Sequence, residues 1–267
     1  MPGKIKIIFF GDVDGKIGRQ AVIKTLSVWK KTYKPDICIA NADNVTHGRS
    51  LNHQHYDDLQ NAGVDIFTAG DHTLEGQEIH KLLEAPEIAV LRPHNLEGDF
   101  PGEGAKIFTI RKKKVLMISL LGRVFMDEPT RNPFIEIDDI LKKFKNSSYD
   151  VALVDFHAEA TSEKHAFAWY VDGRVSAVLG THTHVQTADE RILVKGTGAI
   201  SDVGFCGAMD SVIGVEKEEI LNHFLTGKNF KMRIPEKGWA QVNGVYLEID
   251  SKGKTKKIKR LQSKILI

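Results

Sequence analysis

The chain has 267 residues, of which 42% are hydrophobic and 27% are charged. This balance allows a sizeable core and argues against disorder, so we expect one large α/β domain spanning residues 1–267. Thirty-seven basic side chains face thirty-five acidic ones, which gives a formal net charge of +2. Such a small charge gives no general reason to expect a nucleic-acid coat or a membrane surface as partner.

The cysteines and the N-terminal segment bear on the cellular compartment. Cys38 and Cys206 lie far apart and outside any CxxC pattern, which argues against a disulfide framework and favours a reducing compartment. The apolar stretch near the N-terminus ends at Asp12, too early for a signal peptide, and no apolar run approaches the length of a membrane span. We therefore predict a cytoplasmic protein without membrane contact.

The N-terminal part of the chain alternates predicted strands and helices. Short apolar runs end in polar loops, and the segments between them have apolar residues at helical spacing. In chain order these are strand 5–10, helix 19–33, strand 37–40, helix 51–62 and strand 64–69. Pro35 ends the first helix and Gly63 caps the second. Three rounds of strand, loop and helix are typical of a parallel α/β sheet.

The rest of the chain mixes a hairpin with further α/β units. The stretches 107–110 and 115–121 flank four basic residues at 111–114, which predicts a β-hairpin with a charged turn. Further predicted elements are helix 138–144, strand 151–156, helix 162–170, strand 177–179 and antiparallel strands at 241–249 and 257–267. No linker, repeat or low-complexity segment interrupts the pattern, which favours a single domain.

Five predicted strands end in side chains that can bind a metal ion. These are Asp12; Asp43 with Asn44; Asp71 with His72; His157; and His182 with His184. A single such ending is more often an ordinary loop residue or a helix cap. Ligands of open α/β sheets bind beyond the carboxyl ends of the strands, so we expect all five endings to converge at the same edge of one sheet.

His182 and His184 form the sharpest of these patterns. An i, i+2 spacing in an extended chain places both imidazoles on one side, where they can reach one centre or two adjacent centres. Glycine and threonine surround them, which argues against a role in the core. Imidazole mixed with carboxylate and amide oxygen suits Mn, Fe or Zn better than Mg or Ca. Two ions about 3.5–4 Å apart, bridged by a carboxylate, would use this many ligands and serve phosphoester hydrolysis.

Several longer motifs resemble one known family. They are Gly11-Asp12-Val13, Asn41-Ala42-Asp43-Asn44, Gly70-Asp71-His72-Thr73, the run from Val154 to Ser162 and the run from Gly180 to Glu190. With shorter matches over nearly the whole chain, this set is similar to the bacterial YmdB-type proteins of the calcineurin-like metallophosphoesterase superfamily. The resemblance implies an α/β/β/α sandwich of four layers. It also implies hydrolysis of phosphodiesters, notably 2′,3′-cyclic nucleotides, with some turnover of phosphomonoesters.

Position by position, the resemblance implies two metal sites that share one carboxylate. One ion would be held by Asp12, Asp43, Asn44 and His184, and the other by Asp43, Asp71, His157 and His182. The cofactors implied are two divalent or trivalent transition-metal ions, with Fe or Mn ahead of Zn. His72 matches the family's catalytic histidine, and imidazole is also the side chain best suited to protonate a leaving oxygen near neutral pH.

The chain departs from the family at two of these positions. Asp43 stands where the family usually has Glu, and Asp71 where it usually has Asn. Neither change removes a ligand, but the shorter Asp43 requires its loop to move inward, and Asp71 adds negative charge to its site. Asp14 lies where many superfamily members carry a further ligand; a turn carboxylate beside Gly15 is the preferred interpretation.

Weaker signals concern substrates and partners. Arg92 and Arg123 are candidate clamps for phosphate oxygens, although structural or surface ion pairs explain them equally well. Six basic residues between Lys252 and Arg260 could hold RNA. Their alternation with apolar residues also suits a solvated strand edge, which we prefer. The sequence leaves the oligomeric state open, and a homo-oligomer is compatible with it.

The leading hypothesis is a dinuclear metal-dependent phosphodiesterase that hydrolyses a small nucleotide phosphoester. A metal-activated hydroxide would attack phosphorus in line, because metal binding brings the pKa of water from about 15.7 to about 7. His72 would act as the general acid. One alternative is a phosphomonoesterase that uses the same centre. Another is a regulatory protein whose metal-loaded state is recognised by RNA or by a protein partner.

Overall fold

The computed structural model describes residues 4–229 and 231–267, and its strands form two sheets. The first sheet contains, in spatial order, β2 (Asp12–Val13), β12 (Phe205–Ala208), β13 (Trp239–Ile249), β1 (Ile5–Phe10), β3 (Ile37–Asn41), β4 (Ile66–Thr68) and β5 (Val90–Leu91), with β14 (Thr255–Leu266) paired to β13. Strands β1, β3, β4 and β5 are parallel, as the helical crossovers between them require.

The second sheet is built from the middle of the chain. Its order is β10 (Arg191–Ile192), β11 (Gly198–Ile200), β9 (Ala177–Thr181), β8 (Val151–His157), β7 (Lys113–Leu121) and β6 (Ala105–Ile110). Its central strands β11, β9, β8 and β7 run parallel, and β10 and β6 pair antiparallel at the two edges.

The expectation that all five strand endings lie on one sheet is therefore wrong. Asp12, Asp43 and Asp71 lie at strand ends of the first sheet, whereas His157 and His182 lie at strand ends of the second. The chain changes sheets after β5, when the β6–β7 hairpin begins a new one. An apolar run shows that a segment is a buried strand, but it does not show which strand will be its neighbour.

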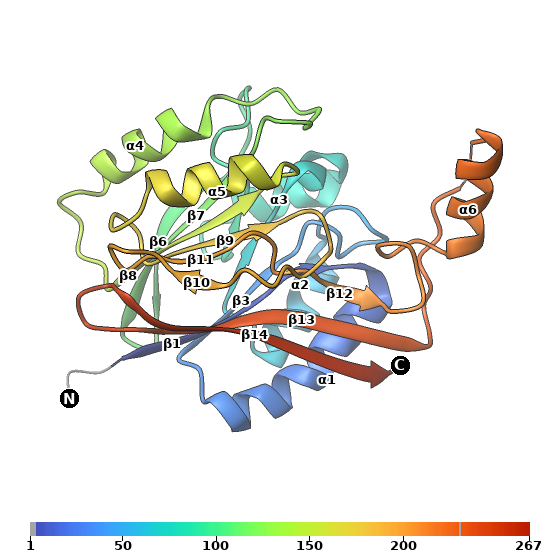
Figure 1. The fold of residues 1–267 in the computed structure, drawn as a ribbon, viewed down its shortest axis with the longest axis horizontal. Helices are drawn as coiled ribbons and strands as arrows, with labels where there is room; N and C mark the ends of the chain where they lie inside the picture. Colours follow the sequence, from blue (N-terminus) through green and yellow to red (C-terminus); the bar gives the residue numbers. More distant parts are fainter. Residues whose placement is uncertain (1–3, 230) are drawn as a thin grey trace.

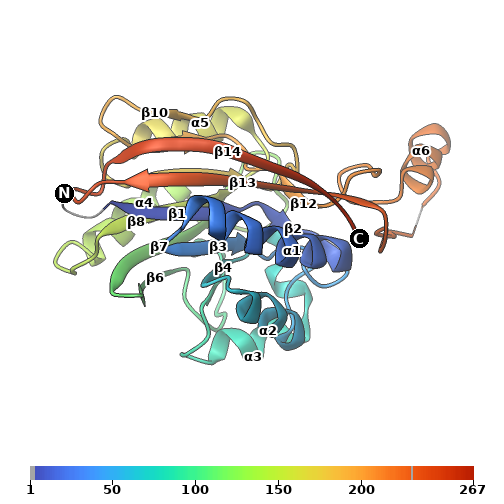
Figure 2. The ribbon, with the colours of Figure 1, turned by 90° about the horizontal axis from the view of Figure 1, so that it is seen from below.

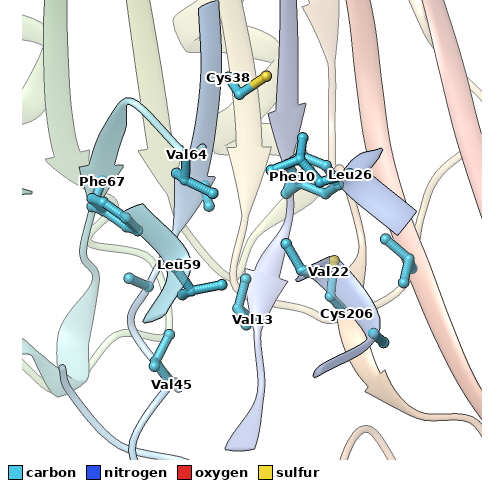
Figure 3. Packing of buried hydrophobic residues seen from close by; sticks show 14 of the residues in the cluster. Phe10, Val13, Val22, Leu26, Cys38, Val45, Leu59, Val64, Phe67 and Cys206 are labelled. Carbon is cyan, nitrogen blue, oxygen red and sulfur yellow. The ribbon is translucent and has the colours of Figure 1, made fainter. Parts of the chain in front are cut away.

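Helices cover the outer faces of both sheets. On the first sheet lie α1 (Gly15–Tyr33), α2 (His53–Ala62) and α3 (Gln77–Glu84), and on the second lie α4 (Pro133–Lys143) and α5 (Thr161–Tyr170) (Figures 1 and 2). An apolar core lies between the first sheet and its helices. Figure 3 shows part of it, with Val22 and Leu26 of α1 near Phe10 of β1. The result is an α/β/β/α sandwich of four layers, which confirms the predicted fold class.

A further apolar core lies between the two sheets. It includes Ile7 and Phe9 from β1, Met117 from β7 and Leu153 from β8, all fully buried. Because β1 and β8 are covered on both faces, their sequences are nearly continuous apolar runs rather than alternating ones. This core is shared by both sheets, and a single domain over residues 1–267 stays a prediction.

Three helices begin at residues clearly different from those predicted, for identifiable reasons. Helix α4 starts earlier, at Pro133, because the side chain of Asn132 caps its N-terminus. Helix α1 starts earlier, at Gly15, and its first turn packs closely on β12: a Cβ atom at Gly18 would lie 2.1 Å from the Cys206 carbonyl oxygen. The glycines that weaken helical propensity here are therefore required by close packing. Helix α2 starts later, at His53, because the side chain of Asn52 caps its N-terminus.

The predicted charged hairpin turn is shorter than expected. Only Arg111 and Lys112 form it, both at positive φ, so Lys113 and Lys114 belong to β7. The sequence did not predict α3, α6 (Lys217–Thr226) or the strands β5, β10, β11 and β12, which have only two to four residues each. Within the described residues, no helix is long and apolar enough to cross a membrane.

Helix α6 stands away from the body of the molecule in both views (Figures 1 and 2). None of its residues is buried. The side chains of Leu221, Phe224 and Leu225 are exposed by 54%, 78% and 84%. Apolar residues spaced in this way normally cover a core, but in α6 these three side chains are exposed.

Candidate metal centre

A cleft of about 320 Å³ lies at the carboxyl ends of the central strands of both sheets. It is lined by His72 and by six of the seven predicted metal ligands, Asp43, Asn44, Asp71, His157, His182 and His184. The seventh, Asp12, is fully buried next to them, and its Oδ2 accepts a hydrogen bond from the backbone of His182 at 3.2 Å. The five strand endings therefore converge, although they come from two sheets.

Cross-sheet contacts are centred on His157, which is almost completely buried. Its Nε2 lies 2.7 Å from Asp71 Oδ1 and 3.7 Å from Asp43 Oδ2, and its Nδ1 lies 3.6 Å from Asp12 Oδ1. The preceding residue of the Asp71 loop must be glycine, because a Cβ at Gly70 would lie 2.3 Å from His157 Nε2. The Gly70-Asp71 pair thus lets the two sheets approach at the centre.

Two groups of side chains could each hold an ion. The ligand atoms of Asp71, His157 and His182 lie within 4.8 Å of one another, as do those of Asp43, Asp71 and His72. Within the first group, His182 Nδ1 is 3.1 Å from His157 Nε2 and 3.3 Å from Asp71 Oδ1. These side chains are within hydrogen-bond distance of one another, and the same nitrogen and oxygen atoms are suited to a shared cation.

His184 points to a different part of the cleft from His182. Its Nε2 lies 3.3 Å from Asn44 Oδ1, its Nδ1 lies 2.8 Å from the Ile213 carbonyl oxygen, and its ring stacks on Phe205. The two histidines therefore reach two adjacent places, which is one of the outcomes that the sequence left open.

The premise of an extended chain at this pair is wrong. Strand β9 ends at Thr181, and His182 and His184 have φ of 99° and 63°. Non-glycine residues rarely adopt such conformations, each of which costs about 1–3 kcal/mol, and they persist only where surrounding contacts hold them.

A buried hydrogen-bond chain fixes the orientation of the His157 ring. His157 Nδ1 lies 2.9 Å from Thr181 Oγ1, and the Thr181 hydroxyl donates to Asp155 Oδ1 at 2.7 Å. Because that hydroxyl gives its proton to Asp155, its oxygen accepts from Nδ1–H of His157, and Nε2 is directed to the cleft. Asp155 is fully buried, and burial raises its pKa to about 6 against the opposing effect of His157.

The acidic side chains are packed more closely than anions tolerate without a cation. Burial raises the pKa of Asp43 to about 6; His157 opposes this effect, and Asp71 adds to it. Burial would also raise the pKa of Asp71, yet hydrogen bonds with His157 and His182 hold it below its usual value. Asp12 Oδ1 is buried and has no hydrogen-bond partner among the described residues. An orphaned carboxylate oxygen among two further carboxylates and three imidazoles suits a transition-metal ion.

His72 lies at the mouth of the cleft, with 30% of its side chain exposed. It follows Asp71 in the short 3₁₀ helix η1 (Asp71–Glu75), and its Nδ1 lies 2.6 Å from Glu75 Oε1. Burial opposes a charged ring, but the carboxylates of Asp43, Asp71 and Glu75 outweigh burial and raise the pKa of His72. Glu75 also forms an ion pair with Arg49. No motif in the sequence predicted that Glu75 would contact His72.

Asp14 lies in the wall of the same cleft and is 2% exposed. Burial raises its pKa to about 6, with the positive charge of His184 opposing and Asp12 adding to the effect. The lining also includes the apolar side chains of Ile213, Val215, Met232 and Ile234. The cleft thus joins a polar centre to an apolar surface.

The two candidate arginine clamps are not among the residues that line the cleft. The guanidinium of Arg92 donates to the carbonyl oxygens of Pro93, Phe100 and Pro101, which is a structural role. Arg123 is exposed, and its backbone nitrogen donates to Glu163. Arg92 is therefore a poor candidate for binding substrate, while a clamp at Arg123 stays a prediction.

The basic stretch from Lys252 to Arg260 is largely engaged with neighbouring side chains. Lys256 pairs with Asp250 and Arg260 with Glu190. The ammonium groups of Lys257 and Lys259 lie over the rings of Tyr246 and Tyr33, at 5.9 and 5.8 Å from the centroids. These contacts agree with the preferred interpretation, in which the residues belong to the solvated strand β14.

Known proteins resemble the chain over almost its full length. A family model described as YmdB-like protein matches residues 8–261. A 2′,3′-cyclic-nucleotide 2′-phosphodiesterase from Bacillus subtilis (strain 168) is 40% identical over 265 residues, which cover 98% of this chain and 97% of that protein. A solved structure of a phosphatase from Mycoplasma pneumoniae has a TM-score of 0.91 at 38% identity, covering 99% of this chain and 95% of that one.

A more distant protein shares the fold alone. The structure of a 5′-nucleotidase precursor from Thermus thermophilus has a TM-score of 0.54 at 9% identity, and covers 99% of this chain and 55% of that one. The high structural similarity to the Mycoplasma pneumoniae protein agrees with the four-layer sandwich. The chain therefore belongs to the YmdB-like family and is a phosphoesterase.

Proposed function

We propose that the chain is a dinuclear metal-dependent phosphodiesterase whose substrates are small nucleotide phosphodiesters, 2′,3′-cyclic nucleotides foremost. One observation carries this proposal: carboxylates of the first sheet and imidazoles of the second meet in one cleft around the buried Asp43. The Bacillus subtilis relative is named for hydrolysis of 2′,3′-cyclic nucleotides, which supports the choice of substrate class.

The side chains present suit two ions that share Asp43. Asp12, Asp43, Asn44 and His184 would hold one ion, and Asp43, Asp71, His157 and His182 the other. Both oxygens of Asp43 already accept backbone hydrogen bonds, from Gly70 at 2.6 Å and from His72 at 3.2 Å, so its carboxylate plane is fixed at the centre. The mixed nitrogen and oxygen donors favour Fe or Mn, with Zn also compatible. When bound, such ions supply Lewis acidity and make hydroxide available near neutral pH.

His72 is placed to transfer the proton that a leaving oxygen needs. A ribose alkoxide is a poor leaving group, so cleavage of its bond to phosphorus is faster when an acid protonates it. Nδ1 of His72 is occupied by Glu75, whereas its Nε2 lies 3.8 Å from Asp71 Oδ2. The partly exposed ring would present Nε2–H to a substrate oxygen at the mouth of the cleft, and Glu75 would hold the ring in this orientation.

The apolar wall of the cleft suits the nucleoside part of the substrate. Ile213, Val215, Met232 and Ile234 offer a surface on which a base can lie while the phosphate occupies the polar centre. A pocket of this mixed kind also favours a nucleotide over inorganic phosphate or a purely polar ester.

The test combines metal analysis with three substrates. Protein purified without chelator is assayed with a 2′,3′-cyclic nucleotide, bis-p-nitrophenyl phosphate and mono-p-nitrophenyl phosphate. We expect about two transition-metal ions per chain and turnover of both diesters that a chelator abolishes and Mn²⁺ or Fe²⁺ restores. Metal-loaded protein that hydrolyses neither diester would refute the proposal.

A phosphomonoesterase on the same centre is the second candidate. The Mycoplasma pneumoniae relative is described as a phosphatase, and that observation favours it. Faster turnover of the monoester than of both diesters would support this candidate instead. Binding of RNA without any hydrolysis would support the regulatory alternative.

A further inference from the structure

A buried ion pair contacts residues 181–184, called the histidine loop below, and takes no part in the proposed chemistry. Lys164, in the first turn of α5, is 4% exposed, and Asp202, in the loop before β12, is 1% exposed. The Lys164 ammonium lies 2.8 Å from Asp202 Oδ2. Neither residue lines the cleft.

The pair holds the chain on both sides of His182. Lys164 Nζ donates to the carbonyl oxygen of Thr181 at 2.8 Å. Asp202 Oδ2 accepts from the backbone nitrogen of Thr183 at 3.0 Å and from its hydroxyl at 2.8 Å. The other oxygen, Oδ1, accepts from Gly204 N at 2.8 Å, which anchors the carboxylate to its own loop. The residues before and after His182 are thus fixed by one buried unit.

Such a unit is needed because the histidine loop is strained. His182 and His184 have positive φ, a conformation that a non-glycine residue keeps only when its surroundings impose it. Buried ion pairs stabilise a fold poorly compared with apolar residues of the same size, because both charges lose their hydration. Their benefit is that partners and geometry are specific. Lys164 and Asp202 therefore select one conformation of the loop rather than add general stability.

We propose that Lys164 and Asp202 are positioning residues that set the place of His182 in the metal centre. The two histidines should depend on them unequally. His184 has anchors of its own in the Ile213 carbonyl and the Phe205 ring, whereas the ring of His182 contacts Asp71, His157 and Glu159. Loss of the pair should therefore disturb the ion held by Asp71, His157 and His182 more than the ion held with His184. The proposal rests on the proposed metal centre.

The experiment compares Lys164→Met with Glu163→Gln as a matched control. Glu163 lies in the same turn of α5. Its carboxylate, however, accepts hydrogen bonds from the backbone of Arg123 and Val124, in a loop that carries no predicted metal ligand. Each variant is titrated with Mn²⁺, and spin-coupled ion pairs are followed by electron paramagnetic resonance. In Lys164→Met we expect the second Mn²⁺, the one held by Asp71, His157 and His182, to bind about 10–100-fold more weakly. This range is typical of residues that orient metal ligands. The first ion should bind as in wild type, and Glu163→Gln should retain both.

A second variant separates positioning from simple destabilisation. Lys164→Met leaves the Asp202 charge buried without a partner, so it should lower the melting temperature. The double variant Lys164→Met, Asp202→Asn removes both charges and should recover most of that loss. If the lysine positions the loop, the second Mn²⁺ should still bind weakly in the double variant. Recovery of normal affinity together with stability would show that the lysine only neutralises Asp202 and would overturn the proposal.

A metal-free readout distinguishes failure of this proposal from failure of the proposed function. In ¹⁵N-histidine-labelled protein without metal, the imidazole signals of His182 should shift or split in Lys164→Met and stay unchanged in Glu163→Gln. The signals of His184 should move little in either variant. Unchanged His182 signals in Lys164→Met would refute positioning, whatever the titrations show. A wild-type protein that binds fewer than two ions would instead count against the metal centre alone.

Discussion

The two sheets bring different chemistry to the cleft and hold it in different ways. Strand ends of the first sheet carry the proposed oxygen ligands, Asp12, Asp43, Asn44 and Asp71, while those of the second carry the proposed nitrogen ligands, His157, His182 and His184. Backbone N–H groups orient the carboxylate of Asp43, whereas buried side chains orient the imidazoles. The first sheet alone offers one mixed group, Asp43, Asp71 and His72. The two proposed sites, in contrast, each combine oxygen ligands of the first sheet with imidazoles of the second, so both need the edges of the two sheets to meet.

Removing the contribution of either sheet should therefore have the largest effect. We expect wild-type protein to bind about two transition-metal ions per chain. The variant His182→Ala, His184→Ala should lose most of them, and Asp43→Ala should lose both, because Asp43 is shared. Elemental analysis after purification without chelator measures the content, and circular dichroism checks the fold. Wild-type protein that saturates at one ion would show that the sheets form a single mononuclear site.

His72 lies beside Asp43 and Asp71, but we do not expect it to bind a metal ion. His72→Ala should keep both ions and lose about 10²–10⁴ in the rate of cyclic-nucleotide hydrolysis, the range for general acid catalysis. The loss should be smaller for a nitrophenyl ester, whose leaving group hardly needs a proton. His80→Ala, in α3 and outside the cleft, is the control. Loss of metal in proportion to activity would make His72 a ligand.

The imidazole side should also make metal binding depend on pH. Burial lowers the pKa of His157, but its hydrogen bond to Asp71 and the charges of Asp43 and Asp12 outweigh burial and raise it to about 10. Below that pH the metal-free ring carries a proton that an ion must displace from Nε2. Affinity should therefore fall as pH falls, by about tenfold per pH unit for one displaced proton. Titration calorimetry at pH 7 to 8.5 in buffers of different ionisation enthalpy counts the protons; none released would contradict a protonated His157.

The smallest effect on activity is expected at Asp71, where the family that the sequence resembles usually has Asn. Asp71→Asn should keep the metal content and leave the rate equal to wild type or somewhat higher, since the amide keeps an oxygen ligand and removes one negative charge. Initial rates with a cyclic nucleotide, at metal content matched to wild type, test this. Metal loss in a well-folded Asp71→Asn protein would show that the proposed site with His157 and His182 requires the charge of Asp71.

The proposed metal ligands could be predicted from the sequence because each one follows a local pattern. Asp43 and His157 stand where an apolar run stops, and such endings can be recognised without knowing the neighbouring strands. Asp155 could also have been found, because it lies two residues before His157 on the same face of β8. The contacts that orient the ligands could not. Lys164 and Asp202 are 38 residues apart, and nothing in either segment indicates the other.

The same limit explains the wrong sheet assignment. The longer central strands, such as β3 and β8, were recognised as buried, but pairing depends on which faces meet in three dimensions, and both sheets contain parallel strands made of similar apolar runs. The bend at His182 was hidden for a related reason: no glycine marks it. Its conformation is imposed by buried contacts from elsewhere in the chain rather than by local preference.

Helix α6 has a consequence for local unfolding. It has ten residues and buries none of them, and isolated helices shorter than about 12–15 residues are only marginally stable in water. Its backbone hydrogen bonds should therefore open at little cost in free energy, and its amide protons should exchange with solvent far faster than those of β8, whose seven residues are all buried. Protected amides in α6 would mean that another molecule covers Leu221, Phe224 and Leu225. Hydrogen exchange thus reports directly on whether this helix is a free arm or a contact between copies of the chain.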